Sequence, residues 1–307
     1  MASKKIKIAI VIVSYNSTSD TIALLRSLIK LPPNHLSLSI VLIDNGTPEK
    51  DYQKLASFAH SKNQISIKLI RNEKNVGLSK ALNQAVPFCK NSDYIWRLDN
   101  DVKVTKSTLN GLIAVAETYP KVGCVGSVAY NYDHHGQLFG GGWRVNWWRG
   151  SVVPIPTPKK PVVCDFVSGF SLLFPTTVIK EIGYLSDENY FAYSEDVDIC
   201  RQVQKLGKKV YLNPNSILYH RQTAVKNLSP FLVNLTIRNR VLMMRKNATK
   251  LQMIAFTPYF FTVATVFNLK NILSLPTNMS QKEILIQAYF KGVSDGFLRN
   301  FVKPSSV

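Results

Sequence analysis

The sequence predicts an α/β protein in which a mostly parallel central sheet carries helices on both faces. Apolar, β-branched runs of strand length alternate with segments of helical periodicity through the first third of the chain. These runs are apolar throughout, which is typical of strands that are covered on both faces. The 307 residues, 46% of them hydrophobic, are sufficient for one large domain or two smaller ones.

Each predicted element rests on its local pattern. The predicted strands are β-branched and apolar: 6–16, 38–46, 65–72, 93–104, 166–175 and 208–220. The predicted helices show apolar spacings of three and four: 17–30, stopped by Pro32 and Pro33, then 51–60, 76–88, 176–183 and 194–206. Residues 131–165 are rich in glycine, proline and tryptophan, and they indicate a long loop or a small hairpin.

Polar side chains follow the predicted strands at their carboxyl ends. Tyr15 and Asn16 end the first strand, Asp44 ends the second, and Asp99 and Asp101 end the fourth. In open parallel sheets, ligands bind beyond these ends. This coincidence predicts a ligand site at that edge of the sheet.

Asp99 and Asp101 form an Asp-x-Asp pair. Two carboxylates at a strand end can share a hard divalent cation, which prefers oxygen ligands and bridges phosphates. Asp and Asn are also common in turns, so the pair alone is a weak signal. His220 ends a later strand, where it is either a structural histidine or a further ligand. Asn75 and Gly77 open a helix whose N-terminus can face a phosphate.

A second acidic cluster, Glu195, Asp196 and Asp198, lies at the start of the predicted helix 194–206. One reading is structural, because acids in a first helical turn interact favourably with the helix dipole. In that reading Ser194 is the N-cap and Arg201 pairs with Asp198. The alternatives are a metal site or a catalytic base.

The net charge of +19 indicates contact with phosphate, on a nucleotide, a nucleic acid or an anionic membrane. The four cysteines form no CxxC pair and are expected to be reduced and buried. Neither GxGxxG nor GxxxxGK[ST] occurs, so dinucleotide oxidoreductases and P-loop enzymes lose their main support. The apolar N-terminus is interpreted as a core strand rather than a signal peptide, which places the protein in the cytoplasm.

The ordered motifs resemble family 2 glycosyltransferases with the GT-A fold, and among them rhamnosyltransferase-like enzymes of bacterial-type surface polysaccharide synthesis. The motifs are VIVSYNS, IDNGT, NVGLSKALNQ, LDNDV, SGFSLLF, YFAYSEDVDIC, ILYHR and RNR. They lie between about residues 6 and 246, and the YFAYSEDVD motif with its later histidine is the most specific. Phe174-Pro175-Thr176-Thr177 departs from relatives, which often carry an arginine pair there.

The resemblance implies a role for each matching position. Ser14, Tyr15, Asn16 and Asp44 would hold the nucleotide of a nucleoside-diphosphate sugar. Asp99, Asp101 and His220 would bind Mg²⁺ or Mn²⁺. Asp196 would be the catalytic base of an inverting transfer, with Glu195 shaping the acceptor site and Asp198 as scaffold. A helix start is expected to keep Asp196 ionised at pH 7.

The acceptor would be a glycan or a polyprenyl-diphosphate-linked glycan. Trp143, Trp147, Trp148 and Arg144 can contact it, because aromatic faces stack on sugars and arginine attracts phosphate. The other reading of these side chains is a core plug beneath the loop.

The chain is divided into a transferase domain, 1–225, and a basic, apolar helical region, 226–307. The second has eleven basic against two acidic side chains, and 251–269 is uncharged. We expect it to attach peripherally to the inner face of the cell membrane. Its other reading is a helical pair that packs on the catalytic domain or forms a homo-oligomer interface. Two functions compete with sugar transfer: nucleic-acid binding, and a catalytically inactive scaffold.

Overall fold

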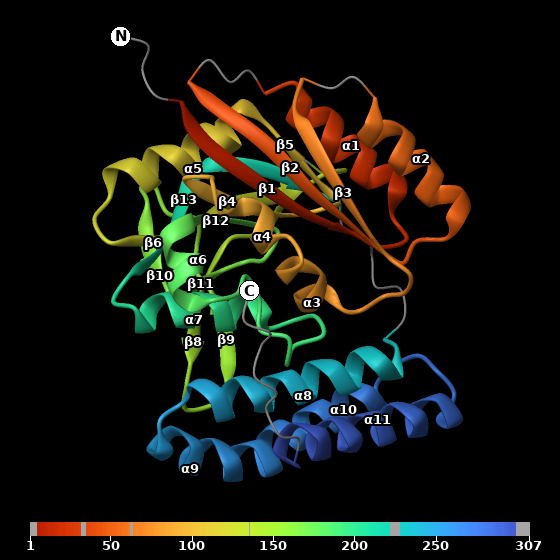
Figure 1. Cartoon of the computed structure of the whole chain (residues 1–307). Helices are drawn as coiled ribbons and strands as arrows, with labels where there is room; N and C mark the ends of the chain where they lie inside the picture. Colours follow the sequence, from red (N-terminus) through yellow and green to blue (C-terminus); the bar gives the residue numbers. More distant parts are fainter. Residues whose placement is uncertain (1–4, 32–34, 62–63, 135, 222–227, 299–307) are drawn as a thin grey trace.

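The predicted alternation of strands and helices forms one half of a ten-stranded sheet in a computed structural model of the chain (Figure 1). The structure describes residues 5–31, 35–61, 64–134, 136–221 and 228–298. The main path of the sheet runs β10-β13-β6-β12-β4-β1-β2-β3, with β5 on β13 and β7 on β6. The strands of this path are β1 (Ile6–Ser14), β2 (Leu36–Asn45), β3 (Ser66–Asn72), β4 (Tyr94–Asp99), β6 (Val122–Asn131), β10 (Val162–Cys164), β12 (Ser171–Pro175) and β13 (Lys209–His220).

The first half of the sheet is parallel, and the second half is mixed. Strands β3, β2, β1 and β4 are parallel neighbours, as the sequence predicts. Strand β12 then runs antiparallel between β4 and β6, while β13 is parallel to β6. Strands β6 and β13 therefore run in the same direction as β4, so that the end of β13, and with it His220, lies at the edge where β4 ends.

Two hydrophobic clusters lie on opposite faces of the sheet. Helices α1 (Thr18–Ile29), α2 (Glu49–His60) and α5 (Lys106–Thr118) cover one face with leucines such as Leu24, Leu55 and Leu112. Helices α3 (Leu78–Asn83), α4 (Val86–Cys89), α6 (Thr176–Ile182) and α7 (Glu195–Lys205) cover the other. The prediction of helices on both faces is confirmed.

Three predicted elements are interrupted. Helix 76–88 divides into α3 and α4 next to Pro87, which cannot donate a backbone hydrogen bond and suits the first turn of a new helix. Strand 93–104 is divided at Asn100 and Asp101, so that β5 (Val102–Val104) pairs with β13 instead. Strand 166–175 is broken before β12, leaving β11 (Phe166–Val167) in a small second sheet.

Helix α5 and strand β6 lie in a stretch for which the sequence analysis predicts no element. Pro32 and Pro33, which were predicted to stop the first helix, lie outside the described residues.

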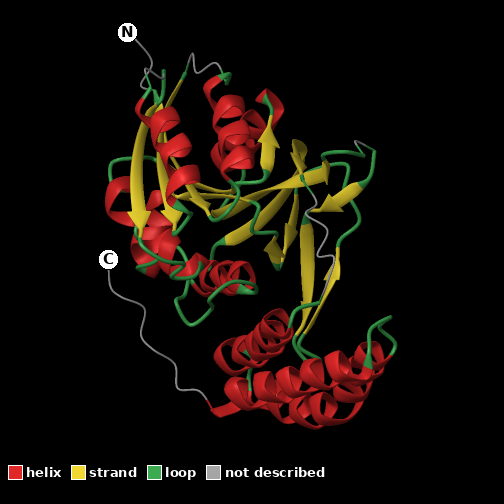
Figure 2. Ribbon diagram, turned by 90° about the vertical axis from the view of Figure 1, so that its right-hand side faces the viewer, coloured by secondary structure: helices red, strands yellow, loops and turns green. Residues whose placement is uncertain are grey.

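The stretch 131–165 forms a hairpin rather than a long loop. Strand β7 (Leu138–Gly140) extends the main sheet, and β8 (Gly142–Asn146) pairs with β9 (Ser151–Pro154). Figure 2 shows this hairpin reaching from the sheet toward the C-terminal helices. At its turn, Gly150 has φ +57°, and a Cβ there would lie 2.7 Å from the Phe256 ring.

The C-terminal helices form a layer beneath the sheet (Figures 1 and 2). They are α8 (Pro230–Asn247), α9 (Lys250–Tyr259), the π-helical turn η1 (Phe260–Ala264), α10 (Thr265–Leu273) and α11 (Met279–Leu298). Helix α8 packs on α7, and α11 packs closely on α8, where a Cβ on Gly292 would lie 2.6 Å from a carbonyl oxygen. Among the described residues, no helix is long and apolar enough to cross a membrane. The predicted boundary at residue 225 lies outside them.

Candidate active site

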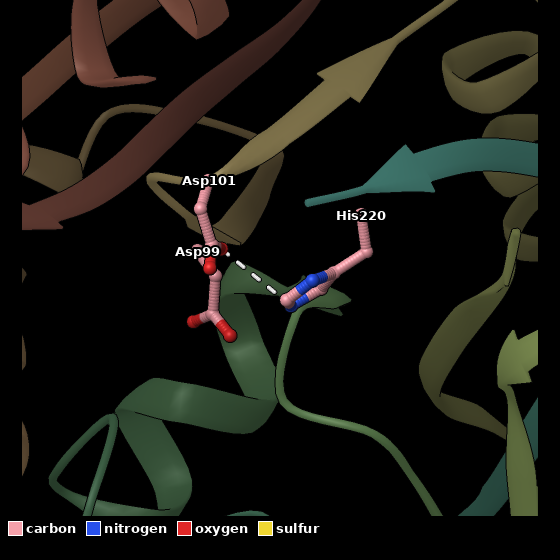
Figure 3. A group of neighbouring side chains, drawn as sticks. All are labelled: Asp99, Asp101 and His220. Atoms are coloured by element: carbon pink, nitrogen blue, oxygen red, sulfur yellow. Dashed lines mark ion pairs between the residues drawn. The ribbon is translucent and has the colours of Figure 1, made fainter. Parts of the chain in front are cut away.

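The Asp-x-Asp pair and His220 converge at the carboxyl end of β4 (Figure 3). One ligand atom from each of Asp99, Asp101 and His220 lies within 4.8 Å of the others, and His220 Nε2 is 3.5 Å from Asp101 Oδ1. The backbone carbonyl of Arg221 lies 3.1 Å from Nδ1 of His220. This contact is expected when Nδ1 carries the proton and donates it to the carbonyl, which leaves the lone pair of Nε2 available to a metal ion. Phe139 stacks on the imidazole at 4.1 Å between ring centroids.

The electrostatics of this group favour a cation. Burial raises the pKa of Asp99, and burial together with the neighbouring Asp99 raises the pKa of Asp101 to about 6. Two carboxylates this close together are stabilised in their ionised forms when a positive charge lies between them. Carboxylate oxygens and one imidazole are suitable donors for Mg²⁺ or Mn²⁺, so the residues fit a divalent ion.

A cavity of about 560 Å³ contains this group, and we call it the donor cavity. Its lining comes from the strand ends, from the turn after β3 and from the start of α7; the polar members are Tyr15, Asn45, Asn75, Arg97, Asp99, Asn100, Asp101, Tyr193, Ser194, Glu195, Asp196 and His220. The predicted ligand site at this edge of the sheet is therefore a real concavity, of a size typical for small-molecule ligands.

The residues predicted for the nucleotide occupy different depths around this cavity. Tyr15 and Asn75 line it, whereas the Ser14 hydroxyl is buried against Thr21 at 2.8 Å. Asp44 is fully buried. Burial raises its pKa, against which Thr47 and then the Arg71 guanidinium, 3.9 Å away, act only weakly.

Asn16 and Gly77 adopt positive φ next to the cavity residues Tyr15 and Leu78. Asn16 has φ 51°, and Gly77, at φ 91°, precedes the short helix α3. Asn75 Oδ1 accepts the Gly77 amide at 2.9 Å and also accepts from Asn45, a cavity residue that the sequence did not single out.

A strained turn positions Asp196. Tyr193 and Ser194 both have φ 65°, a conformation that non-glycine residues rarely adopt. Asn239 of α8 holds this turn, because its Nδ2 donates to the carbonyl oxygens of Ala192 and Tyr193 at 2.6 and 2.7 Å. Ser194 precedes the helix, but its side chain makes no capping hydrogen bond, so the predicted cap is wrong. The left-handed backbone accounts for this.

The carboxylate of Asp196 faces the donor cavity and accepts two backbone hydrogen bonds. They come from Val197 at 2.8 Å and from Gly169 at 3.1 Å. Burial, followed by repulsion from Glu195, nevertheless raises the pKa of Asp196 to about 7. The expectation that the helix start keeps it fully ionised at pH 7 is therefore wrong, because desolvation outweighs the dipole. A carboxylate with a pKa near neutrality is well matched to general-base work.

Glu195 is tied to Arg97, a residue that the sequence reading passed over. Arg97 Nη2 donates to Glu195 Oε1 at 2.5 Å, and both side chains are at most 5% exposed. Burial works against the charge of Arg97, but Glu195 and Asp99 more than offset this and raise its pKa. The signal in the sequence was an arginine within the otherwise mostly apolar strand β4, because a buried arginine needs an acidic partner.

Asp198 is held by α8, not by Arg201. Its carboxylate accepts from Lys246 Nζ at 2.7 Å and from Asn247 Nδ2 at 2.8 Å, and Lys246 also bonds Asp187 at 2.5 Å. The predicted Asp198–Arg201 pair is wrong, because Arg201 points to the other side of α7 and lies over the Trp147 ring. These contacts give Asp198 the scaffold environment that was expected of it.

The predicted acceptor residues separate in the structure. Trp143 lines a second cavity that also contains Asp196. Trp147 packs against the core beneath Arg201, Trp148 is 56% exposed, and Arg144 pairs with Asp165 on the hairpin. The structure thus brings Trp143 alone of these four next to the candidate base.

Comparisons with known proteins agree with this geometry. The family model described as glycosyl transferase family 2 matches residues 9–182. A relative from Mycobacterium tuberculosis (strain ATCC 25618 / H37Rv), N-acetylglucosaminyl-diphospho-decaprenol L-rhamnosyltransferase, is 23% identical, with 60% of this chain and 67% of the relative covered.

Two solved structures share the fold at low sequence identity. Mannosyltransferase PcManGT from Pyrobaculum calidifontis, in complex with GDP-Man and Mn²⁺, has a TM-score of 0.62 at 13% identity, covering 97% of this chain and 88% of its own. S. aureus TarS 1–349 in complex with UDP-GlcNAc has a TM-score of 0.58 at 17% identity, covering 94% and 81%.

Proposed function

The chain belongs to glycosyl transferase family 2 and has the GT-A fold, and from this premise we propose that it is an inverting, divalent-metal-dependent transferase. That it is a glycosyltransferase follows from its family. The proposal adds a donor, a nucleoside-diphosphate sugar, and an acceptor hydroxyl on a glycan or a polyprenyl-diphosphate-linked glycan. It also adds a role for each residue of the donor cavity.

One observation carries the proposal: the Asp99, Asp101 and His220 group and the Asp196 carboxylate line the same cavity. The first three residues would hold Mg²⁺ or Mn²⁺, which supplies Lewis-acid stabilisation of a diphosphate leaving group. Tyr15, Asn75 and the buried Asp44 lie at the strand ends on the nucleotide side. Relatives of the fold are complexed with GDP-Man and Mn²⁺ or with UDP-GlcNAc, which supports a donor of this class.

Asp196 acts on the acceptor. Its carboxylate takes the proton from the acceptor hydroxyl while that oxygen forms a bond to the anomeric carbon. The bond from the anomeric carbon to the phosphate oxygen breaks, and the nucleoside diphosphate leaves with the electron pair. A single displacement of this kind inverts the anomeric configuration. Glu195, held by Arg97, adds negative charge beside the base and so keeps its pKa raised.

The competing functions are weaker. Because the chain is a glycosyltransferase, the phosphates of a donor and an acceptor account for its positive charge without a nucleic acid. An inactive scaffold has no need of an acid pair, a histidine and a separate carboxylate around one cavity. The name of the rhamnosyltransferase relative contains a sugar linked to diphospho-decaprenol, which supports a lipid-linked acceptor for this chain as well.

The donor side is tested by nucleotide binding with and without metal. We expect Mn²⁺ to strengthen the binding of UDP, GDP or dTDP, measured by calorimetry, and EDTA to remove this gain. Asp101→Asn should weaken metal-supported binding by about tenfold or more, since it removes one charged ligand. Asp133→Asn, an exposed acid on a nearby turn, is the matched control and should bind as the wild type does. Binding that is indifferent to EDTA contradicts the metal assignment.

We further propose that the outer face of α9, η1 and α10 rests on an anionic membrane surface. Exposed apolar side chains at helical spacing occupy this face; they are Leu251, Ile254, Phe261, Val263, Val266, Phe267 and Leu273. Lys250 and Lys270 flank the uncharged stretch. Apolar burial in the interface combined with attraction to anionic lipid is the usual basis of such attachment.

Co-sedimentation with vesicles tests this attachment. The wild type should bind vesicles that contain phosphatidylglycerol more tightly than purely phosphatidylcholine vesicles, because of its positive charge. The double variant Val266→Asp/Phe267→Asp should reduce binding about tenfold or more, since it places two charges in the apolar face. Equal binding by this variant and the wild type would show that another surface is used.

A further inference from the structure

A second cavity, of about 440 Å³, lies between the catalytic sheet and α8. Most of its wall is apolar or aromatic, and the polar groups are few. Its lining comes from the hairpin, β11, the start of α7 and α8: Trp143, Gly150, Ser151, Val152, Phe166, Ser168, Tyr193, Ser194, Asp196, Val197, Arg240 and Met243. We call it the hairpin cavity.

The hairpin cavity and the donor cavity meet at the candidate base. Tyr193, Ser194 and Asp196 line both. A hydroxyl in the hairpin cavity can therefore reach the carboxylate of Asp196 without entering the part of the donor cavity that Asp99, Asp101 and His220 line. An acceptor needs such a separate approach to the base, so that it can be positioned beside a bound donor sugar.

One cation lines the hairpin cavity, and neutral groups hold it. Arg240 donates from Nε to the Gly150 carbonyl and from Nη2 to the Arg149 carbonyl, both at 2.7 Å, and its guanidinium lies over the Phe260 ring. Burial lowers its pKa from the usual arginine value, but arginine stays charged in proteins. Within the part of the chain that the structure describes, no carboxylate lies within 4.0 Å of it.

A partly buried charge without a counter-ion is costly unless an anion approaches it. The backbone contacts fix Arg240 through Nε and Nη2, and its side chain also hydrogen-bonds Tyr259, so the guanidinium is oriented before any ligand arrives. Planar guanidinium groups bind phosphate oxygens strongly and with defined geometry. The apolar wall beside Arg240 excludes water and suits hydrocarbon rather than a second sugar.

We propose that the hairpin cavity binds a diphosphate ester on an alkyl chain, with Arg240 on the phosphates and the chain against Trp143, Phe166 and Met243. This rests on the proposed function, because it identifies the acceptor as lipid-linked and places its sugar hydroxyl at Asp196. Arg240 is then a specificity-determining residue that selects a lipid diphosphate over a free glycan.

The test is binding of three probes to the metal-free protein in EDTA, followed by tryptophan fluorescence. The probes are decyl diphosphate, inorganic pyrophosphate and decanol. Without metal, the Asp99, Asp101 and His220 group does not recruit a phosphate, so the measurement is independent of the donor side. We expect decyl diphosphate to bind the wild type at least tenfold more tightly than either other probe. Arg240→Gln should remove most of this advantage and leave decanol binding unchanged.

Two further variants keep the result decisive. Ser151→Glu places a negative charge in the cavity and leaves Arg240 unmutated. It should also weaken the binding of decyl diphosphate about tenfold or more. Lys106→Gln, at an exposed cation at the start of α5, is the matched control and should bind all three probes as the wild type does. If the wild type binds pyrophosphate as tightly as decyl diphosphate, the cavity is a general anion site, and the assignment of a lipid diphosphate is wrong.

Unchanged decyl diphosphate binding in both Arg240→Gln and Ser151→Glu would overturn the assignment. Failure of the metal-dependent nucleotide test, by contrast, would remove the donor mechanism and leave this cavity assignment standing. The two experiments use different ligands and different metal conditions, so their failures are distinguishable.

Discussion

Asp196→Asn is expected to lower kcat by about a hundredfold to ten-thousandfold, the range that a positioned general base contributes. The asparagine keeps the size of the side chain, but its single amide oxygen can replace only one of the two carboxylate oxygens that accept from Gly169 and Val197, and it cannot take the acceptor proton. Transfer is measured by mass spectrometry of products from a panel of nucleotide sugars and a lipid-linked acceptor extract. Binding of the nucleotide with Mn²⁺ should remain within about twofold of the wild type. Retained turnover would remove Asp196 from the mechanism.

The pH dependence gives an independent measurement of the same residue. Burial raises the pKa of Asp196 to about 7 in the folded protein, so kcat should fall as pH decreases through that value. The linked effect on stability has the opposite direction. A carboxyl whose folded-state pKa is raised contributes stability below its unfolded pKa, and this contribution is lost as pH rises through 7. Asp196→Asn should therefore gain stability relative to the wild type between pH 4 and pH 8, while Asp133→Asn should not.

Lys246→Met is expected to destabilise the protein by about 3–5 kcal/mol, because it leaves two buried carboxylates without their cation. Asp187 and Asp198 are at most 1% exposed, and Lys246 Nζ lies 2.5 and 2.7 Å from them. Burial works against the charge of Lys246, but Asp198 and Asp187 raise its pKa, so it is charged at neutral pH. Urea unfolding at pH 7.5 measures the loss as a lower midpoint at a similar slope.

Lys250→Met is the matched control for this measurement. Lys250 is exposed at the start of α9, and its removal should change the free energy of unfolding by no more than about 0.5 kcal/mol. A similar loss in both variants would mean that general charge, rather than the buried network, accounts for the effect. Lys246→Met with wild-type stability would show that the two carboxylates are protonated in the folded state.

Much of the donor side could be predicted because strand ends in a parallel sheet share one edge. Asp99, Asp101 and Tyr15 lie at that edge for this topological reason, and His220 joins them because β13 runs in the same direction as β4, on the other side of the antiparallel strand β12. That the sheet reverses there could not be read from periodicity, since a buried strand is apolar whichever way it runs. The pattern of residues left His220 as either a structural histidine or a further ligand, and the family resemblance favoured the ligand.

The errors near α7 come from contacts that are distant in sequence. Ser194 has the right residue type for a cap, but Asn239 pulls the preceding turn into a left-handed conformation. Arg201 has the right spacing to pair with Asp198, but Lys246 and Asn247 occupy that carboxylate. Local rules describe what a residue can do, and tertiary partners decide which option is used. Arg97 was overlooked for the related reason that its partner is distant in the chain.

The contacts of α8 with α7 limit how this enzyme can be recombined with its relatives. Asn239, Lys246 and Asn247 all belong to α8, yet they hold the turn and the helix that present Asp196. A chimaera that joins this catalytic sheet to the helical layer of another transferase would lose those three partners at once. The helical layer therefore has to be inherited together with the base that it supports.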